Sequence, residues 1–440
     1  MATHIEYTPS SSPAGVQQTI SFWMKRSELG TDQCIFEARQ NGTNLSSVKF
    51  NTNDELQIYS ENGGTTNVYL KTNRRFRDVN AWYHIVYAID TSQGTAADRI
   101  KMYVNGVQET SFSSSTYPSS SYDNFWFGIA QKQVIGRDNQ GGGSEDFQGL
   151  LTHFHYSRGY VYQASTFGST DSTTGEWKIT TSPSGVNYGA TGWFILKDGN
   201  SVTDQSGNGN NFTVGSGTLT KTEDCPSNVF STLDILNHKT SACTYSNGGT
   251  TVSFPGAWVF ALGNMGVSSG KWYWEAKCNS GNNSNSYYGI CADMVPLNHG
   301  FYNNSQNGAI MIGVGSNGDT YIDGSYTSGG TSPVNNNTDI LSLALDLDSG
   351  TKTLKIYKNG TLLSTNGTIN LSSYYNDTFV YPCFSGNTSS ASASFNVNFG
   401  NGYFGTTAVS SAGTNASGIG IFEYNVPAGY TAICTKGLNE

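Results

Sequence analysis

The fold class of this chain is decided by a short stretch, Ile100-Lys101-Met102-Tyr103-Val104-Asn105-Gly106-Val107. Apolar and polar residues alternate up to the Asn-Gly pair, and an Asn-Gly pair between alternating runs is the strongest short-range signal of a β-hairpin. A second such pair, Asn359-Gly360, follows the run Leu354-Lys355-Ile356-Tyr357. Both halves of the chain are therefore predicted to contain antiparallel strands.

The composition favours many short strands over helices or disorder. Among 440 residues there are 52 Gly, 26 Tyr and 22 Phe, and only 12% of the residues are charged. Disordered chains have few aromatic residues and a high net charge, so disorder is excluded. Turn-forming residues mixed with aromatic ones are typical of strands joined by tight turns. We therefore expect an all-β fold built as two antiparallel β-sandwiches, without a long helix.

Charge, hydropathy and cysteine usage exclude several classes of protein. The net charge of −9 and the isoelectric point of about 5.1 oppose a nucleic-acid binder, because such proteins need a basic face. No apolar run approaches the ~18 residues of a membrane helix, and the start Met1–Tyr7 lacks the features of a signal peptide. The seven cysteines form no CxxC pair, so we expect buried free thiols and synthesis in a reducing cytoplasm.

A first module is expected over residues 1–165. Runs typical of strands occur over residues 19–24, 82–90 and 147–156, separated by clusters of turn-forming residues. All eight arginines lie at or before Arg158. This shift in composition marks a boundary between modules.

The rest of the chain is expected to hold a second sandwich. Residues 166–225 are predicted to form a structured connector, and residues 226–403 the second sandwich, with aromatic or apolar strands over 271–276 and 340–347. The remaining residues, 404–440, are predicted to form an extended C-terminal segment.

The first module resembles a known family. Its segments 19–24, 82–86, 101–106 and 135–137, followed by Phe147-x-Gly149, occur in an order that resembles the laminin-G / concanavalin A-like jelly roll. This resemblance implies a two-sheet β-sandwich.

The second module resembles another sandwich. Gly270–Glu275, Tyr288–Ile290, Leu343–Asp346 and Tyr357–Gly360 resemble a SPRY domain, which is found mainly as a binding module. The resemblance implies an antiparallel two-sheet architecture here as well.

The combination of modules resembles virion proteins of marine tailed bacteriophages. It includes the Ser206–Asn210 element, the Asp224-x-Pro226-x-Asn228 motif between the modules and the closing Val426–Tyr430. In those proteins such domains lie on capsid decorations, fibres or tail appendages. This chain departs from the pattern at its last residues, Gly437–Glu440, where an apolar Asn-Leu-Pro is usual.

One basic cluster is a candidate ligand-binding site. Lys71, Arg74, Arg75 and Arg77 lie close together in the sequence, and arginine binds phosphate and carboxylate groups bidentately. The cluster is therefore a candidate site for an anionic glycan. The alternatives are a solvated loop and a docking surface for an acidic neighbouring subunit.

Aromatic residues after a serine-rich run are a second candidate. The side chains of Tyr122 and Trp126 could stack on sugar rings. Because Phe125 and Phe127 share one face of an extended segment and Trp126 the other, we expect at least one of these faces to be core.

A metal site is suggested by acidic residues around a glycine loop. Asp138, Glu145 and Asp146 flank Gly141–Gly143. Laminin-G-like folds often bind Ca²⁺ at a loop rim, and hard cations prefer such oxygen ligands. These carboxylates are thus a candidate Ca²⁺ site, with solvated loop acids as the alternative. No cofactor is expected to be required.

A pair of histidines is better explained by structure than by metal binding. His153 and His155 would share one strand face, but a zinc site needs a third and a fourth ligand. His84, within the run 82–90, is expected to be a core or sheet-face residue.

The sequence predicts that the protein is not an enzyme. Gly266–Gly270 matches G-x-S-x-G but precedes a tryptophan-rich strand, whereas a nucleophile elbow needs a following helix. Gly313–Gly318 matches G-x-G-x-x-G but also leads into a predicted strand, which indicates a hairpin. The neighbouring acids Asp54-Glu55 and Glu145-Asp146 would point to opposite faces, so paired-carboxylate glycosidase chemistry is not expected.

Together these features predict a non-enzymatic phage virion surface protein that adsorbs to host surface glycans. We expect other virion proteins and host glycans as partners and a homo-oligomer, with neither nucleic acid nor membrane insertion. Weak binding per site would be raised by many copies. One alternative is a purely structural capsid-decorating or cementing protein that binds other virion subunits. Another is a carbohydrate-active enzyme with dispersed carboxylates, or an adhesin outside phages.

Overall fold

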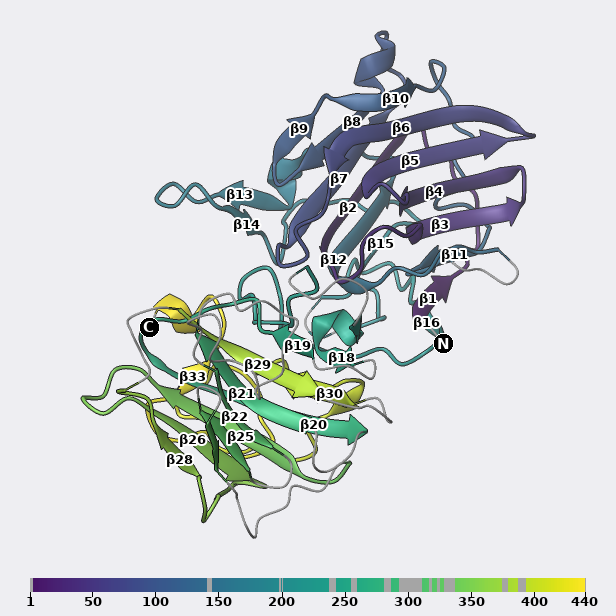
Figure 1. The fold of residues 1–440 in the computed structure, drawn as a ribbon. Helices are drawn as coiled ribbons and strands as arrows, with labels where there is room; N and C mark the ends of the chain where they lie inside the picture. Colours follow the sequence, from purple (N-terminus) through teal and green to yellow (C-terminus); the bar gives the residue numbers. More distant parts are fainter. Residues whose placement is uncertain are drawn as a thin grey trace. The chain divides into compact units, whose positions relative to one another are not determined.

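A computed structural model describes most of the chain. The described residues are 3–140, 145–197, 199, 201–236, 243–254, 259–280, 286–292, 311–315, 319–322, 325–327, 337–373, 379–386 and 393–439. They form two compact units, Met1–Lys221 (unit 1) and Thr222–Glu440 (unit 2) (Figure 1).

Unit 1 is a sandwich of two antiparallel sheets. The eight-stranded sheet has the order β10 (Phe112–Thr116), β6 (Thr65–Arg75), β5 (Glu55–Asn62), β4 (Asn44–Phe50), β3 (Gln33–Asn41), β11 (Gln133–Ile135), β1 (His4–Tyr7) and β16 (Thr213–Ser216). The six-stranded sheet has the order β15 (Trp193–Ile195), β12 (Gly149–Arg158), β2 (Gln17–Arg26), β7 (Tyr83–Asp90), β8 (Ile100–Val104) and β9 (Val107–Glu109). Alternate residues of both sheets, such as Phe22 and Ile58, meet in one core.

The predicted hairpin joins β8 and β9. Asn105 and Gly106 both adopt positive φ angles, +48° and +79°, as a two-residue turn of this kind requires. Val104 pairs with Val107 directly across the turn.

The outer face of the six-stranded sheet is also covered. Val86 packs against Ala164, in the 3-10 turn Ala164–Thr166, and against Phe167, just after this turn. Trp177 packs against the same cluster. It is the first residue of β14 (Trp177–Ile179), which pairs with β13 (Gly168–Thr170). Because both faces are buried, β2 and β7 are buried along almost their whole length.

The segment predicted to be a connector contributes strands to unit 1. β15 pairs with β12, and β16 pairs with β1, so residues up to 221 fold with the first sandwich. The turn after β15 is closed by the buried Asp204 carboxylate, which accepts the backbone N–H groups of Phe194 (2.9 Å), Ser206 (2.9 Å) and Asn210 (3.0 Å).

Unit 2 also contains two sheets, which are antiparallel except where β33 joins the larger one. The larger has the order β17 (Thr244–Ser246), β18 (Thr251–Ser253), β30 (Ser394–Asn398), β20 (Lys271–Ser280), β25 (Ile340–Asp346), β26 (Thr353–Lys358) and β27 (Thr361–Leu362), with β28 (Thr368–Asn370) on β26 and β33 (Thr431–Ala432) on β20. The smaller has the order β19 (Val259–Leu262), β29 (Val380–Gly386), β21 (Ser286–Ala292), β22 (Met311–Gly315), β23 (Thr320–Ile322) and β24 (Ser325–Thr327). A core containing Trp274, Leu343 and Phe384 joins residues of both sheets.

The C-terminal residues cover the other face of the larger sheet. β33 runs parallel to β20, and Phe422 packs edge-on against Tyr273 with ring centroids 4.9 Å apart. A short hairpin, β31 (Tyr403–Phe404) with β32 (Thr407–Ala408), precedes this cover. The segment after residue 403 is therefore packed onto its sandwich, which the sequence pattern alone does not reveal.

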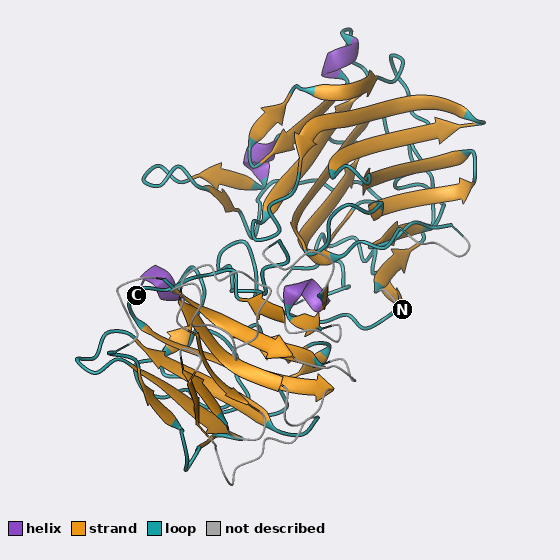
Figure 2. Cartoon of the chain, in the orientation of Figure 1, coloured by secondary structure: helices purple, strands orange, loops and turns teal. Residues whose placement is uncertain are grey.

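The all-β prediction is confirmed. In the described part of the chain the helical elements are three-residue 3-10 turns: Ala96–Asp98, Ala164–Thr166, Asn247–Gly249 and Gly437–Asn439 (Figure 2). None of the described helices could cross a membrane. All seven cysteines are free thiols, as the sequence predicts.

Candidate functional site

The structure pairs most of the predicted basic cluster with carboxylates of unit 1. Lys71 Nζ lies 3.4 Å from Glu55 Oε2, and Arg74 Nε lies 2.7 Å from Glu109 Oε2. The third pair joins Arg77 Nε and Asp54 Oδ2 at 2.9 Å.

Arg75 differs from its neighbours in the cluster. It is exposed, has no ion-pair partner among the described residues and lies opposite Glu55 in the strand register. The cluster is thus a set of ion pairs with one open guanidinium, which leaves little net charge for an anionic ligand.

Asp54 is the centre of this network. Its carboxylate is buried and accepts hydrogen bonds from Arg26, Arg77 and the backbone N–H of Gly30, at 2.9 to 3.0 Å. Burial alone would raise its pKa, but the Gly30 N–H and the two guanidinium groups outweigh that effect and hold the pKa of Asp54 below its usual value. The carboxylate is therefore committed to structure.

The two predicted aromatic ligand residues are held by the protein itself. Tyr122 is buried, and its hydroxyl donates to Asn67 Oδ1 at 3.3 Å. Trp126 is half-buried, and its indole N–H donates to the carbonyl of Glu61 at 3.1 Å. Neither ring forms an open platform.

The structure also separates the three predicted Ca²⁺ ligands into different contacts. Both oxygens of Glu145 lie 3.0 Å from Lys49 Nζ, Asp146 pairs with Arg137 at 3.3 Å, and Asp138 accepts the Glu145 N–H at 3.3 Å. Over the described residues no three His, Cys, Asp or Glu side chains form a group that could hold a metal ion. The glycines of this loop lie outside the described residues.

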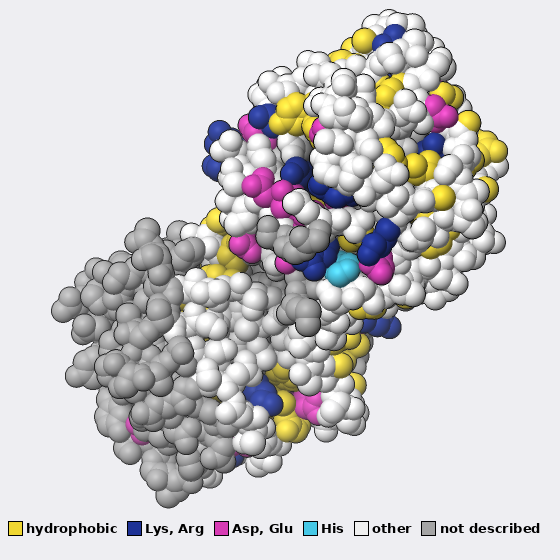
Figure 3. Space-filling view, turned by 90° about the vertical axis from the view of Figure 1, so that its right-hand side faces the viewer, with side chains coloured by type: hydrophobic (Ala, Val, Ile, Leu, Met, Phe, Trp, Pro, Cys, Tyr) yellow, Lys and Arg dark blue, Asp and Glu magenta, His cyan; other side chains and the backbone are white. Residues whose placement is uncertain are grey.

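The surface of unit 1 shows the same balance of charge. Figure 3 shows basic and acidic side chains gathered together on one side of this unit, while most of the remaining surface is neutral. No basic or acidic field dominates this view, in keeping with the ion pairs described above.

The histidines of β7 and β12 belong to aromatic stacks. His84 lies between Trp23 and Trp177, with ring centroids 4.8 and 6.0 Å away, and Trp177 Nε1 donates to His84 Nδ1 at 3.0 Å. His155 stacks on Phe194 with centroids 3.8 Å apart.

The predicted histidine pair of β12 lies at an irregularity. The pairing of β12 with β2 shifts register between Thr152 and His155, and His153 has a φ of +48°. A regular two-residue alternation therefore does not hold there.

The sequence motifs of enzymes lie on strands or next to them. Gly266–Gly270 leads directly into β20, as predicted, and Trp272 Nε1 donates to the Ser269 carbonyl at 2.6 Å. The second motif, residues 313–318, begins at the end of β22, and β22 pairs with the following strand β23. Residues 316–318 of this motif lie outside the described residues.

The outer face of the eight-stranded sheet carries a feature that the sequence analysis missed. Tyr59 on β5 and Tyr69 on β6 are directly opposite each other, with ring centroids 5.8 Å apart in an edge-to-face arrangement. Their neighbours Ile58 and Leu70 point into the core, so the tyrosine side chains point outward. Both tyrosines remain partly exposed.

Polar groups flank the two rings. Gln57 and Lys71 are the next residues on the tyrosine side of β5 and β6 and pair with each other in the strand register. Gln57 is 7% exposed and Lys71 is half-buried. The amide of Gln57 and the hydroxyl of Tyr69 have no hydrogen-bond partner among the described residues. We call this surface, formed by Gln57, Tyr59, Tyr69 and Lys71, the tyrosine face.

One edge of the tyrosine face is fixed. The Tyr59 hydroxyl donates to Glu61 Oε2 at 2.5 Å and lies 3.2 Å from Thr66 Oγ1. Burial and the hydrogen bond to Glu61 raise the pKa of Tyr59. The ring is therefore held as a neutral, oriented surface, which suits stacking and hydrogen bonding with a polar ring.

The alternation of residues could have indicated this face. Leu56-Gln57-Ile58-Tyr59 and Val68-Tyr69-Leu70 place every aliphatic side chain on one side and both tyrosines on the other. The sequence does not show that the two strands are neighbours in the register that brings the rings together.

Comparison with known proteins agrees with this architecture. Residues 2–164 match the family model Laminin_G_3, described as the concanavalin A-like lectin/glucanases superfamily. A comparison with curated proteins finds no match.

Several solved structures are similar at low identity. The SPRY domain of human HERC1 is 18% identical and covers 38% of this chain and 96% of its own, with a TM-score of 0.29. The heptameric SAP-like pentraxin from Limulus polyphemus is 17% identical. The similarity covers 48% of this chain and 88% of the pentraxin chain, also with a TM-score of 0.29. A third structure is Domain 4 of AbnA, a GH43 extracellular arabinanase from Geobacillus stearothermophilus, in complex with arabinotriose. It is 19% identical, and the similarity covers 35% of this chain and 66% of that chain, with a TM-score of 0.26. These similarities carry no argument, and the match of residues 2–164 is a similarity to the concanavalin A-like lectin/glucanases superfamily over one part of the chain.

Proposed function

We propose that this chain is a non-enzymatic carbohydrate-binding protein of a phage virion surface and that the tyrosine face is its glycan-binding site. The observation that carries the proposal is the pair of partly exposed rings, Tyr59 and Tyr69, beside the unpaired amide of Gln57. Aromatic rings bind the apolar faces of sugars, and amide or ammonium groups hydrogen-bond their hydroxyls. Residues 2–164 match a superfamily that includes lectins, which supports this choice of ligand.

The carboxylates near the tyrosine face support binding without catalysis. Glu55 pairs with Lys71, Glu61 accepts the Tyr59 hydroxyl, and Glu37 binds Arg39 through both oxygens at 2.7 and 3.1 Å. Glycosidases need one carboxylic acid and one free carboxylate facing the scissile bond. These three side chains are instead engaged with their own neighbours.

Binding to this face is expected to be weak per site. The face is open and offers two rings and few unpaired polar groups, so one site would bury little of a sugar chain. Many copies on a virion, in contact with other virion proteins and with host glycans, would raise the overall affinity.

Removing both rings is expected to weaken glycan binding strongly. We predict that Tyr59→Ala combined with Tyr69→Ala lowers the affinity for an oligosaccharide by roughly a hundredfold, since each stacked ring contributes about 1.4 kcal/mol, a tenfold effect. A glycan array would first identify the oligosaccharide, and isothermal titration calorimetry would then compare the variants.

Tyr160→Ala is the matched control, because Tyr160 is a surface tyrosine of the same unit, 40% exposed and outside the tyrosine face. Its affinity should equal that of the unchanged protein. Equal affinities for all three proteins would contradict the proposal. Binding to no glycan, with tight binding to empty capsids, would favour a purely structural capsid-decorating protein. Release of reducing sugar would identify an enzyme.

Metal removal is expected to leave binding unchanged. Glu145 is paired with Lys49, and Asp146 with Arg137, so two of the three predicted Ca²⁺ ligands already have a cationic partner. The third, Asp138, accepts the backbone N–H of Glu145. The array profile should be the same with and without EDTA. A profile lost in EDTA and restored by Ca²⁺ would contradict this expectation.

A further inference from the structure

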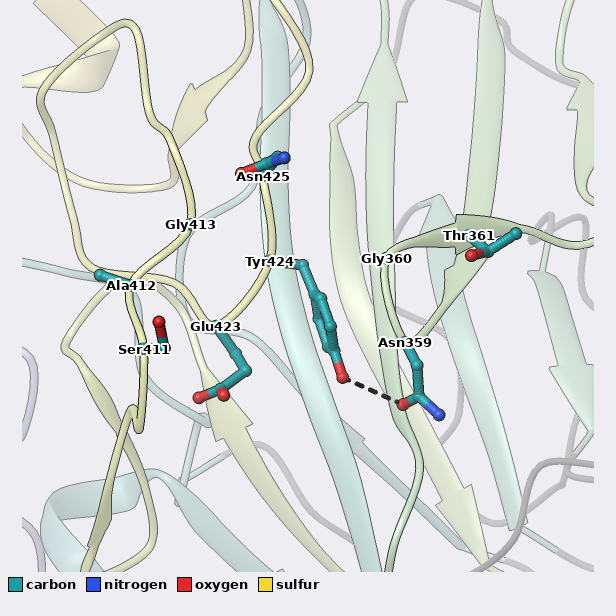
Figure 4. A pocket seen from close by; sticks show the side chains of 9 residues that line it. All are labelled: Asn359, Gly360, Thr361, Ser411, Ala412, Gly413, Glu423, Tyr424 and Asn425. Atoms are coloured by element: carbon teal, nitrogen blue, oxygen red, sulfur yellow. Dashed lines mark hydrogen bonds between the residues drawn. The ribbon is translucent and has the colours of Figure 1, made fainter.

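A polar hollow of about 420 Å³ lies on unit 2. One wall is the turn Asn359–Thr361 between β26 and β27, and the other is formed by the C-terminal segments 411–413 and 423–425 (Figure 4). Pockets for small ligands commonly occupy roughly 300–1,000 Å³. The hollow is therefore large enough for a small ligand.

A buried carboxylate positions the C-terminal wall. Glu275 on β20 accepts the backbone N–H groups of Glu423 at 2.8 Å and of Tyr424 at 2.9 Å. Its own position is fixed by the Tyr273 hydroxyl at 3.0 Å. Since Glu275 is buried, this attachment is protected from water, and the two residues that point into the hollow are held at fixed positions.

The Tyr424 ring spans the two walls. Figure 4 shows it between the Asn359–Thr361 turn and the segment 411–413, with its hydroxyl donating to Asn359 Oδ1 at 3.3 Å. Any Cβ at Gly360 would lie 2.8 Å from a carbon of this ring, so the glycine allows the turn to approach it closely. The ring is thus supported from behind by the turn.

Several polar groups around this ring have no partner. The hydroxyls of Ser411 and Thr361 and the amide nitrogen of Asn425 make no hydrogen bond to any described residue. Among the described residues, Ser410 is the one donor to the Glu423 carboxylate, so its oxygens keep capacity to accept more hydrogen bonds. An oriented ring is therefore surrounded by both donors and acceptors.

We infer that this hollow is a second binding site, specific for a neutral saccharide of one or two rings. A sugar presents an apolar face for the Tyr424 ring and hydroxyls that both donate and accept, matching Ser411, Thr361, Asn425 and Glu423. The Glu423 carboxylate opposes an anionic ligand. The polar lining gives an apolar ligand few partners.

This site does not depend on the proposed function of unit 1. The two sites share no residue, and each can be removed by changes within its own unit. Loss of one binding event with retention of the other would therefore tell the two proposals apart.

The test is a ligand-observed saturation-transfer NMR titration of the full chain. The probes are the methyl glycosides of glucose, galactose, mannose and N-acetylglucosamine, with inorganic phosphate as an anionic probe. At least one glycoside should give saturable signals, and phosphate should not bind. Tyr424→Ala should weaken binding by roughly tenfold or more, whereas Tyr424→Phe, which keeps the ring, should weaken it much less.

Two further variants guard against loss of the fold. Ser411→Trp places a bulky side chain at an exposed position on the rim and should block binding without disturbing the core. Thr368→Ala, an exposed position on β28 outside the hollow, is the matched control and should bind normally. The tyrosine-face double variant should keep the signals of this site.

Absence of saturable signals for every glycoside would overturn the inference. Equal binding by the unchanged protein, Tyr424→Ala and Ser411→Trp would also overturn it, because the sugar would then lie elsewhere. Binding of phosphate at this site would contradict the assignment to a neutral ligand.

Discussion

Acidification from pH 6.5 to 4.5 is expected to destabilise unit 1 by about 2 to 3 kcal/mol through His84 alone. The ring is buried, and its Nδ1 accepts the indole N–H of Trp177, so Nε2 carries the proton and donates to Ser21 Oγ at 2.9 Å. A second proton would have to be placed on Nδ1, where a donor already points. Burial lowers the pKa of His84 to about 3.

The sign follows from the two pKa values of this histidine. In the unfolded chain His84 takes up a proton near pH 6.5, but in the folded chain only near pH 3. The stabilisation is therefore fully present above pH 6.5 and is lost as the pH falls toward 3. His155 adds to this loss, because burial also lowers its pKa well below the usual value.

Differential scanning calorimetry of the full chain between pH 7 and pH 4.5 measures the effect. His84→Gln keeps an acceptor for Trp177 and a donor for Ser21 but does not titrate, so its unit 1 transition should depend less on pH. His4→Gln is the comparison variant. Burial also lowers the pKa of His4, but this ring is only half-buried, so His4→Gln should reduce the pH dependence less than His84→Gln. An equal pH dependence of the unchanged protein and His84→Gln would contradict this account.

Unit 2 is expected to respond in the opposite direction over the same range. Burial raises the pKa of Glu275 to about 7, despite the hydrogen bonds that it accepts. Its contribution to stability is present below the unfolded pKa near 4.5 and is lost as the pH rises through 7. On acidification the unfolding temperature of unit 1 should therefore fall, while the Glu275 contribution should raise the unfolding temperature of unit 2.

The substitution Asp54→Asn is expected to destabilise unit 1 by about 3 to 5 kcal/mol, because it leaves the buried guanidinium of Arg26 without its counter-charge. Arg26 is 1% exposed, and it has one other described polar contact, the Phe76 carbonyl at 2.9 Å. Asp54 has a φ of +63°, which asparagine also tolerates, so the change tests charge rather than backbone strain.

Urea unfolding followed by tryptophan fluorescence measures this loss. Asp98→Asn is the matched control, because it removes an exposed ion pair with Lys101 at 3.2 Å and should cost less than about 1 kcal/mol. Adding Arg26→Met to Asp54→Asn should recover part of the stability by removing the unpaired charge. Equal losses for Asp54→Asn and Asp98→Asn would show that the buried pair is not important.

The elements with local causes could be predicted from the sequence. The hairpins at Asn105-Gly106 and Asn359-Gly360 follow from turn chemistry alone, and both Asn-Gly pairs have positive φ angles in the structure. The strand over 82–90 follows from its run of apolar and aromatic residues. Its burial on both faces does not, because Trp177 and Phe167, which cover it, come from a later segment.

The candidate sites depended on pairings between distant residues and were harder to predict. Arg74 is close in sequence to other basic residues, but Glu109, its ion-pair partner, lies 35 residues away. The register that opposes Tyr59 and Tyr69 is likewise a property of the folded sheet. For the same reason, residues 166–221 could be predicted to contain a strand but not to complete the sheets of unit 1.

A crystal structure of the full chain with the oligosaccharide selected on the array would show whether the tyrosine face binds sugar. We expect a sugar ring in van der Waals contact, within about 4.5 Å, with the rings of Tyr59 and Tyr69, and a hydroxyl bonded to the Gln57 amide. An oligosaccharide ordered elsewhere on unit 1, with both tyrosine rings uncovered, would contradict it.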